Sequence, residues 1–323
     1  MTRVVAVHKT GGPDVLTLED WPVAEPGQGE VRVRQTAIGL NFIDTYQRSG
    51  LYPMPLPFVA GNEAAGVVEA VGEGVAGIKV GDRVCYQGVA GAYADERIVP
   101  AAKLVPIPDG VDDRTAAAVL LKGLTAFYLL FKTWPLQKGE SILWHAAAGG
   151  TGLIATQWAR ALGATVIGTA GGSEKVALAL AHGCHHAIDY RTDDFAARVK
   201  EITGGRGVDV VYDGVGKATF EGSLDCLRAR GLLASFGNAS GVVSVPDLGI
   251  LARKGSLYVT RPTGIHYFGE RAALLEGAKA LFDAILSGAI KVEIGQTFAL
   301  ADVAEAHRAL EGRDTTGSVV LTP

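Results

Sequence analysis

The fold is decided by the stretch Ser141-Ile142-Leu143-Trp144-His145-Ala146-Ala147-Ala148-Gly149-Gly150-Thr151-Gly152. It starts as an apolar run typical of a buried strand and ends in a glycine-rich turn, after which residues 152–162 have the pattern of a helix. A strand, a glycine-rich turn and a helix in this order predict a site for the pyrophosphate of a dinucleotide. The first N–H groups of such a helix are unpaired and carry the positive end of its dipole.

Three positions of this turn, Ala147, Gly149 and Gly152, match the dinucleotide fingerprint. Gly149 lets the backbone approach the pyrophosphate, and Gly152 lets the helix pack close to the strand. We therefore expect Gly149, Gly150, Thr151 and Gly152 to bind the cofactor. Because Ala147 stands where a first glycine is usual, the turn by itself also fits another kind of α/β protein. The elements that follow it favour the dinucleotide site.

Strands and helices alternate with short connections from this stretch onward. The strands are expected at Ser141–His145, Thr165–Thr169, Ala187–Asp189, Val208–Tyr212, Gly231–Phe236 and Leu257–Thr260. The helices are expected at Gly152–Leu162, Glu174–His182, Phe195–Thr203 and Ala218–Leu227. Such alternation predicts a Rossmann fold, a doubly wound parallel sheet with helices on both faces.

The chain on either side of this region has a different pattern. Up to about residue 110, short strands recur between glycines, at Arg3–His8, Glu30–Ala37, Ala64–Val71, Asp82–Gln87 and Tyr93–Val99, which predicts a mostly β, barrel-like domain. Two helices, Arg114–Leu121 and Gly123–Lys132, are expected to join near Lys122.

The elements after Pro262 are too few for a core of their own. They are a helix at Ala272–Leu286, a strand at Lys291–Ile294, a helix at Val303–Glu311 and a strand at Ser318–Leu321. We therefore expect them to return to the N-terminal domain. The Rossmann domain, residues 123–261, is then an insertion into a domain made of residues 1–122 and 262–323.

Composition excludes several classes of function. A chain of 323 residues is long enough for two domains, and its net charge of −4, with no Lys/Arg run, gives no reason to expect a nucleic-acid or membrane-surface partner. The longest apolar stretch, Ala116–Phe131, contains Lys122 and is expected to be too short to cross a bilayer. Three well-separated cysteines and an N-terminus without a signal-peptide pattern favour a cytoplasmic protein.

The end of the second Rossmann strand distinguishes NAD from NADP. An NAD site places a carboxylate there for the ribose 2′-hydroxyl, but residues 166–173 contain none. Ser173 and Lys175 lie where a 2′-phosphate would be, and Tyr190-Arg191 can converge on the same place. Taken singly, Ser173 is as well explained as a helix cap and Lys175 as a solvated side chain. Together, and without the acid, they favour NADPH.

Several segments also carry a family resemblance. They are Asn41-Phe42-Ile43-Asp44-Thr45-Tyr46, Gly50-Leu51-Tyr52-Pro53, Glu63-Ala64-Ala65-Gly66, Val80-Gly81-Asp82-Arg83-Val84, His145 to Gly152, Tyr212-Asp213-Gly214-Val215-Gly216 and Ser235-Phe236-Gly237-Asn238. In order and spacing they resemble the quinone oxidoreductases, the zeta-crystallin-like branch of the medium-chain dehydrogenase/reductase superfamily, over the whole chain. The resemblance implies a Rossmann domain inserted in a split GroES-like catalytic domain, NADPH as cofactor, a quinone as substrate and a homodimer.

The zinc alcohol dehydrogenases of the same superfamily differ at their metal ligands. They carry a Cys where this chain resembles Asn41, and a Gly-His-Glu motif where it has Gly61-Asn62-Glu63. A carboxamide is a poor zinc ligand, and no second cysteine follows Cys85 to form their structural zinc lobe. We therefore expect no metal.

The chemistry is assigned to a small set of polar and aromatic side chains. Asn41 and Tyr46 are expected to be the catalytic hydrogen-bond donors to the substrate oxygen that gains charge, with Tyr52 and Thr125 helping to bind the substrate. The cofactor is expected to contact Asn41, Lys122, Thr125, Gly149, Gly150, Thr151, Gly152, Gly171, Ser173, Lys175, Tyr190, Gly214, Phe236, Asn238 and Arg313. Of these, Lys122, Thr125 and Arg313 are placed at the cofactor by the family resemblance.

Two other functions remain open. A reductase of activated alkenes such as enones would use the same fold and cofactor, with Tyr46 as a proton donor. A protein of another class would keep the cofactor fold only for binding, for example of RNA, or for a crystallin-like role; the intact loop and the absence of a basic stripe disfavour it. Turnover of quinones and enones with NADPH and NADH would separate these functions.

Overall fold

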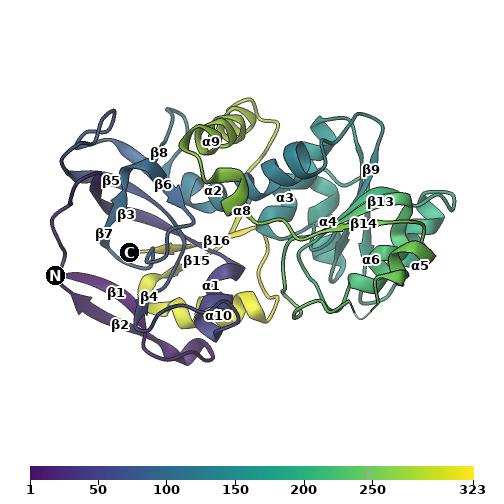
Figure 1. Cartoon of the computed structure of the whole chain (residues 1–323), viewed down its shortest axis with the longest axis horizontal. Coiled ribbons are helices and arrows are strands. Elements are labelled where there is room, and N and C mark those ends of the chain that lie inside the picture. The colour runs from purple at the N-terminus through teal and green to yellow at the C-terminus, as the bar shows by residue number, and fades with distance from the viewer. Residues whose placement is uncertain (246) are drawn as a thin grey trace. The chain divides into compact units, whose positions relative to one another are not determined.

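The computed structural model describes residues 1–245 and 247–323, and the chain divides into two compact units (Figure 1). Unit 1 comprises Met1–Leu124, Phe268–Leu286 and Val292–Pro323, and unit 2 comprises Thr125–Tyr267 and Ser287–Lys291. The division into residues 1–122 with 262–323 and residues 123–261 stays a proposal for the domain boundaries.

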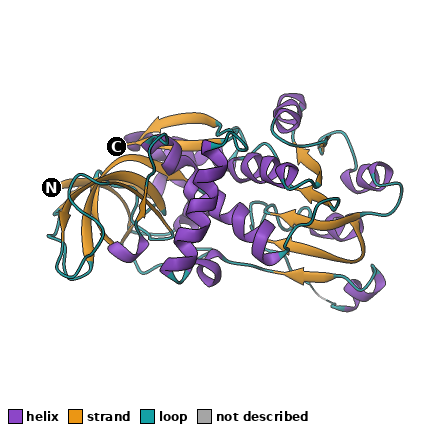
Figure 2. Ribbon diagram, turned by 90° about the horizontal axis from the view of Figure 1, so that it is seen from above, coloured by secondary structure: helices purple, strands orange, loops and turns teal. Residues whose placement is uncertain are grey.

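Unit 2 is built on a six-stranded parallel sheet. In spatial order its strands are β11 (His186–Asp189), β10 (Thr165–Ala170), β9 (Ser141–Trp144), β12 (Val208–Asp213), β13 (Leu227–Ser235) and β14 (Tyr258–Thr260). The helices are α3 (Gly150–Ala161), α4 (Ser173–Ala181), α5 (Phe195–Ile202), α6 (Phe220–Cys226) and α7 (Gly249–Arg253), and Figure 2 shows helices on both sides of the strands. From β9 the chain extends the sheet first on one side and then on the other, which confirms the predicted doubly wound Rossmann fold.

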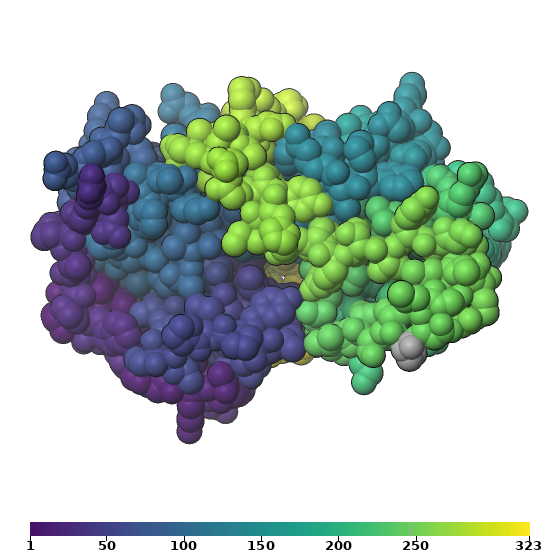
Figure 3. All heavy atoms as spheres, viewed as in Figure 1, coloured from purple at the N-terminus to yellow at the C-terminus, as the bar shows by residue number. Residues whose placement is uncertain are grey.

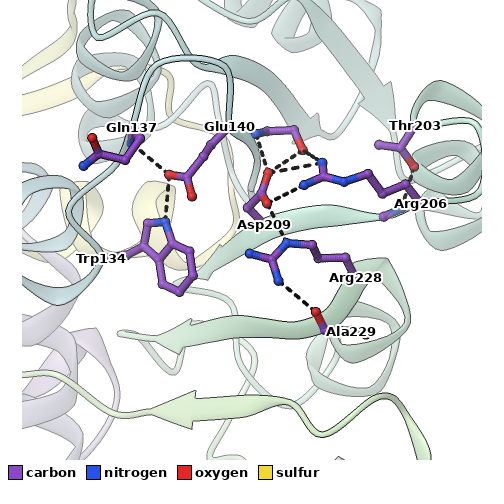
Figure 4. A network of polar contacts seen from close by, with 10 residues as sticks. Trp134, Gln137, Glu140, Thr203, Arg206, Asp209, Arg228 and Ala229 are labelled. Carbon is purple, nitrogen blue, oxygen red and sulfur yellow. Dashed lines mark hydrogen bonds and ion pairs between the residues drawn. The ribbon is translucent and has the colours of Figure 1, made fainter.

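The N-terminal ends of three of these strands are tied together by one buried carboxylate (Figure 4). Asp209 accepts the main-chain N–H of Ser141 at 2.8 Å and bonds from Arg206 at 2.6 Å and Arg228 at 2.6 Å. Burial alone would raise the pKa of Asp209, but these hydrogen bonds and charges outweigh it and lower the pKa to about 2. This network lies at the sheet edge opposite the carboxyl ends, where ligands of such sheets bind.

Unit 1 contains two sheets and most of the β-structure. The larger has the order β15 (Ile294–Ala299), β16 (Ser318–Thr322), β3 (Glu30–Leu40), β5 (Glu63–Val71), β6 (Arg83–Gln87) and β8 (Val105–Pro106), with β7 (Glu96–Pro100) also paired to β3. The smaller has the order β2 (Leu16–Trp21), β1 (Thr2–Val7) and β4 (Phe58–Val59), and this N-terminal segment reaches the surface in purple in Figure 3. The inward faces share one apolar core, which includes Val33, Ile38, Tyr86 and Leu321.

The remaining elements of unit 1 connect and cover these sheets. They are α1 (Phe42–Ser49), α2 (Asp113–Phe127, which ends in unit 2), α9 (Arg271–Leu286), α10 (Val303–Glu311) and the short turns η1 (Pro13–Val15), η2 (Ala101–Lys103) and η4 (Leu300–Asp302), with α8 (Gly264–Phe268) at the boundary between the units. The last strand, β16, pairs antiparallel with β3, with Val319 opposite Leu40. This pairing confirms that the C-terminal segment returns to the N-terminal domain, as a GroES-like domain with an insertion requires.

One predicted break in the chain was wrong. The two helices expected to join near Lys122 are one continuous helix, α2, which runs on into the π-helix η3 (Tyr128–Thr133). Gly123, beside the expected junction, lies inside this helix and serves packing, because a Cβ there would overlap the side chain of Leu281 on α9. The missing side chain lets the two helices approach closely.

One predicted strand was also misplaced. Residues Lys291–Ile294 alternate like a strand, yet β15 begins only at Ile294 and continues to Ala299. Gly295 lies within this strand, against the backbone of Thr316, where a Cβ would overlap the carbonyl oxygen.

By length and composition alone, one helical segment of the described chain, Asp113–Thr133, would be able to cross a membrane. The apolar stretch Ala116–Phe131 lies inside this segment, in which α2 and η3 together give 21 residues. Of its most apolar window, 72% is buried within the protein, as in the core helix of a soluble protein.

Candidate functional site

The dinucleotide loop of unit 2 has the geometry that its sequence predicts. Gly149 caps α3, so Gly150, Thr151 and Gly152 form the first turn, whose main-chain N–H groups have no partner within the helix. A Cβ on Gly152 would lie 2.5 Å from the carbonyl oxygen of Ala146 and 2.7 Å from that of Ala147. Only glycine lets the helix start this close to the loop, and the cradle that results fits a pyrophosphate.

A buried polar network holds the base of this loop. His145, at the end of β9, bonds to Thr169 Oγ1 at 2.9 Å and to Ser223 Oγ at 3.0 Å, and Ser223 donates to Asp213 at 3.0 Å. Burial lowers the pKa of His145, although the nearby Asp213 opposes that effect, so the ring is held neutral. The network joins the carboxyl ends of β9, β10 and β12, which keeps the loop and the neighbouring turns in register.

The ends of β10 and β11 meet at the position expected for a ribose 2′-substituent. A Cβ on Gly171 would lie 2.5 Å from the Tyr190 hydroxyl and 3.1 Å from Arg191 Nε, so both side chains lie against this turn. Asp189 is a carboxylate at this edge, but its Oδ1 accepts the N–H groups of Gly172 at 2.9 Å and Arg191 at 3.0 Å. Those bonds lower the pKa of Asp189 and commit that oxygen to the turn.

The neighbouring helix completes this edge. Gly172, with φ +94°, is the N-cap of α4, so Ser173 is the first helical residue rather than the cap. Ser173 is exposed and Lys175 is half-buried, both within the first turn. Ser173 and Lys175 in the first turn of α4, and Tyr190 and Arg191 after β11, thus follow the ends of two neighbouring strands, β10 and β11.

The expected residues on β12 and β13 lie at the same carboxyl edge. A Cβ on Gly214 would be 3.0 Å from the ring of Phe236, which packs 5.4 Å from Trp144 of β9. Asn238 follows in the turn after β13, where its carbonyl oxygen accepts the N–H of Gly241 at 2.9 Å. Gly214 thus leaves room for Phe236 beside the first strand, next to the dinucleotide loop.

Unit 1 contains a second cluster, centred on a carboxylate that sequence reasoning missed. Glu63 is fully buried at the start of β5. It accepts a bond from Asn41 Nδ2 at 2.8 Å, one from the main-chain N–H of Leu121 at 2.5 Å, and an ion pair from Lys122 Nζ at 3.3 Å. Asn41 and Lys122, expected from the sequence to lie at one site, are therefore brought together by Glu63.

The nitrogen of the Asn41 side-chain amide points toward buried groups of the protein. Besides the bond to Glu63, Nδ2 donates to the carbonyl oxygen of Gly39 at 3.3 Å. An amide nitrogen has only two N–H bonds, and these two partners use both. In this geometry both N–H bonds of Asn41 are used within the protein, whereas the sequence predicts Asn41 as a donor to the substrate.

Aromatic rings line the outer side of α1. Tyr46 lies edge-on to Tyr52, with ring centroids 5.2 Å apart, and 6.2 Å from the ring of Phe42. The main-chain N–H of Tyr52 donates to the carbonyl oxygen of Tyr46 at 3.0 Å, which fixes the loop after α1 against the helix. The structure thus brings Tyr46 and Tyr52 together as one half-buried aromatic wall, suited to a flat ring.

The position of a metal-ligating histidine in related enzymes is occupied here by a structural amide. Asn62 Nδ2 donates to Asp44 Oδ1 at 2.7 Å and to Gln47 Oε1 at 2.7 Å. Asp44 also accepts the N–H of Asn41 at 2.8 Å and the hydroxyl of Tyr93 at 2.9 Å. Burial raises the pKa of Asp44 to about 6 against the effect of these bonds. In the described residues no group of three or more His, Cys, Asp and Glu side chains is arranged to hold a metal ion.

Two expected residues are not part of these clusters. Thr125 belongs to unit 2, whereas Lys122, one turn earlier on α2, belongs to unit 1. Arg313 is exposed in unit 1, with a φ of +62° in the turn after α10. Glu63 and Asp44 were not among the site residues predicted from the sequence. A signal for Glu63 was its position next to Asn62 in a segment that already carried the family resemblance.

Comparisons with known proteins cover the whole chain. Residues 27–109 match the family model described as the alcohol dehydrogenase GroES-like domain, and residues 150–276 match that of the zinc-binding dehydrogenases. The chain is 57% identical to a quinone oxidoreductase of Pseudomonas aeruginosa, with 100% of both chains covered. It is 50% identical to a 2-haloacrylate reductase of Burkholderia, covering 100% of this chain and 99% of that protein. The structure matches Escherichia coli quinone oxidoreductase complexed with NADPH, with a TM-score of 0.98 at 51% identity over all of both chains.

Proposed function

Because the chain belongs to the quinone oxidoreductase family of the medium-chain dehydrogenase/reductase superfamily, we propose that it oxidises NADPH and reduces a quinone. NADPH, a proton and a quinone then give NADP⁺ and a hydroquinone. The observation that carries the proposal is the first turn of α3, where Gly152 makes a cradle that fits a dinucleotide pyrophosphate.

The proposed cofactor site in unit 2 consists of the phosphate loop and the strand ends beside it. Bound NADPH supplies the hydride, and the protein's task is to hold and orient it. Lys175, Tyr190 and Arg191 would hold the 2′-phosphate, supported by the position of Arg191 against Gly171. The other proposed contacts in unit 2 are Thr125, Gly149, Gly150, Thr151, Gly152, Ser173, Gly214, Phe236 and Asn238. Asn41, Lys122 and Arg313 of unit 1 are proposed to contact the cofactor as well.

The proposed acceptor residues are Tyr46 and Tyr52 of unit 1, with Thr125 of unit 2. The edge-on pair of tyrosine rings offers a wall for a planar quinone, and the Tyr46 hydroxyl offers a hydrogen bond to the oxygen that gains charge. The Asn41 amide is proposed to contribute its oxygen as a hydrogen-bond acceptor, because both of its N–H bonds are used by Glu63 and Gly39. Asn41 therefore keeps its proposed place in the site as an acceptor of hydrogen bonds.

The test is a substrate panel with the purified protein. NADPH oxidation is followed with a benzoquinone, with an enone and with a 2-haloacrylate, and each is repeated with NADH. The proposal expects the benzoquinone with NADPH to be fastest. Tight NADPH binding without turnover of any acceptor would instead favour a protein that keeps the fold for binding alone.

A second candidate is reduction of an activated carbon–carbon double bond. It is favoured by the relative that is a 2-haloacrylate reductase, at 50% identity over the full chain. In that reaction hydride adds to one alkene carbon and a proton to the other, so a proton donor is needed where a quinone needs only a hydrogen bond. The phenol of Tyr46 is the proposed donor.

Three further features belong to the proposal. The enzyme works without zinc, because the carboxamide of Asn62 is a poor ligand and its nitrogen is committed to Asp44 and Gln47. It is a cytoplasmic homodimer. The dimer is supported by the outer strand β14, where Tyr258 is 60% exposed and Val259 37%, and where a second copy would pair the open edge. The location is supported by three buried cysteines without a disulfide.

A further inference from the structure

The carboxylate of Glu63 divides its two oxygens between two kinds of partner. Oε1 accepts the main-chain N–H of Leu121 at 2.5 Å, so it is anchored to the backbone of α2. Oε2 accepts the amide of Asn41 at 2.8 Å and the ammonium of Lys122 at 3.3 Å. One oxygen thus fixes the carboxylate, and the other holds two side chains that come from different elements.

The surroundings are built to admit this carboxylate. A Cβ on Gly39, opposite Glu63 in the pairing of β3 and β5, would overlap Oε2. The side chains of Glu63 and Lys122 are 0% and 8% exposed. A buried ion pair of this kind is weak evidence for a gain in stability, since desolvation offsets most of the attraction. Its placement therefore calls for a reason other than stability.

We propose that Glu63 is a positioning residue of the reductase, which sets the orientation of the Asn41 amide and the position of the Lys122 ammonium for the nicotinamide end of the cofactor. The proposal rests on the function proposed above. By taking the amide nitrogen, Glu63 leaves the oxygen of Asn41 to accept a bond from a ribose hydroxyl. By pairing with one N–H of Lys122, it holds in place a cation that has three donors.

The substitution Glu63→Gln keeps the bond to the Leu121 N–H but removes the acceptor shared by Asn41 and Lys122. The new amide oxygen can still accept the Leu121 N–H, but its NH₂ group then faces the amide nitrogen of Asn41 and the ammonium of Lys122. Donors would face donors at the place of Oε2. The Asn41 amide is then expected to turn over, and Lys122 loses its anionic partner, while the helix anchor remains.

The experiment is a double-mutant cycle with Lys122→Met, read by NADPH fluorescence titration and by kcat/KM. Each single variant is expected to raise the dissociation constant of NADPH by about 10-fold, as the loss of a bond to a charged group does. The double variant is expected to be weaker than either single variant, but by less than the product of the two effects. Both substitutions remove the Glu63–Lys122 interaction, and only the turned Asn41 amide adds a further loss. Fully multiplicative effects would mean that Glu63 does not act through Lys122, and this outcome would overturn the proposal.

Two further variants serve as controls, one for the loss of a carboxylate near α2 and one for the length of the Glu63 side chain. Asp113→Asn removes another carboxylate at the start of α2, bonded to Thr36 at 2.7 Å and Arg83 at 2.8 Å, and should leave NADPH binding unchanged. Glu63→Asp keeps the charge but is one methylene too short to serve both sets of partners, so it should also weaken binding. If Glu63→Asp binds NADPH like the unmodified protein, positioning is refuted, even where Glu63→Gln does not fold.

Failure of the proposed function looks different from failure of this inference. If the unmodified protein binds no NADPH and reduces no quinone, the function itself is wrong. If it does both but the cycle is multiplicative, only the role of Glu63 is wrong.

Discussion

Replacing the cationic residues that follow β10 and β11 with alanine should reduce the preference of the protein for NADPH over NADH. The 2′-phosphate of NADPH carries nearly two negative charges, and the proposed partners are Lys175 in the first turn of α4 and Arg191 beside Gly171. Arg191 offers a planar fork to a phosphate, whereas Lys175 offers a point charge. We expect each single alanine variant to lose one charge-assisted interaction with the 2′-phosphate and to keep its contacts with the rest of the cofactor.

The magnitude follows from the exposure of the two side chains. A bond between a cation and an anion is worth roughly 1.5–3 kcal/mol, which corresponds to about 10- to 100-fold in affinity. Lys175 is half-buried and Arg191 is exposed, so we expect the lower part of that range for Arg191→Ala. Because the site is open to water, the loss should shrink as salt is added. NADH carries no phosphate there, and its affinity should stay unchanged.

The assay is a fluorescence titration of both cofactors against each variant at low and high salt, with kcat/KM measured alongside. Lys200→Ala, on the neighbouring helix α5, is the matched control for loss of a positive charge and should change neither affinity. The reasoning is refuted if the unmodified protein uses NADH as well as NADPH. It is equally refuted if Lys175→Ala weakens both cofactors alike, because that lysine would then support the turn rather than bind the phosphate.

Three other outcomes follow from the structure. Tyr46→Phe should lower quinone turnover modestly but alkene reduction by about 100-fold or more, in rates compared on the two acceptors, because only the second needs a proton donor; equal effects would remove Tyr46 from both mechanisms. Asp209→Asn should lower the free energy of unfolding by roughly 2 kcal/mol near neutral pH. The folded-state pKa of Asp209 lies near 2, below its usual value of 3.8, so its stabilisation is present above about pH 4 and is lost as the pH falls toward 2. Urea titrations over that range should therefore find a steeper loss in the unmodified protein than in the variant, and parallel curves would contradict the pKa. Val259→Lys on the open edge of β14 should give a monomer in sedimentation at micromolar concentration, and an unchanged mass would place the dimer contact elsewhere.

The Rossmann fold was predictable because its signals are local. Each buried strand of unit 2 is a short apolar run, and each crossover helix follows within a few residues, so topology rules leave few arrangements. Two of the errors fall at glycines whose purpose is not local. Gly123 lies inside α2 and Gly295 inside β15, and each is small because another segment lies against it, Leu281 in one case and Thr316 in the other. The sequence pattern shows where a side chain is missing and does not show what occupies its place.

The half of the site that lies in unit 2 was predictable for the same reason. Gly149 to Gly152, Gly171 and Gly214 follow directly after strands whose carboxyl ends share one edge, so sequence order alone places them together. Tyr190 and Arg191 follow the third strand in the same way, and the structure brings both against Gly171. What the sequence did not reveal is that Asp189, only one residue earlier, uses an oxygen to hold the turn.

The half in unit 1 depends on contacts between distant residues. Glu63 meets Asn41 across 22 residues of chain and Lys122 across 59. Nothing in the local pattern of β5 distinguishes a glutamate that faces solvent from one that is fully buried. Asn41 was read as a donor because carboxamides can donate, and the reversal of that role is decided by the carboxylate opposite it. The identity of a site residue can thus be predicted from its sequence segment, whereas the direction of its hydrogen bonds is set by the partner that the fold places beside it.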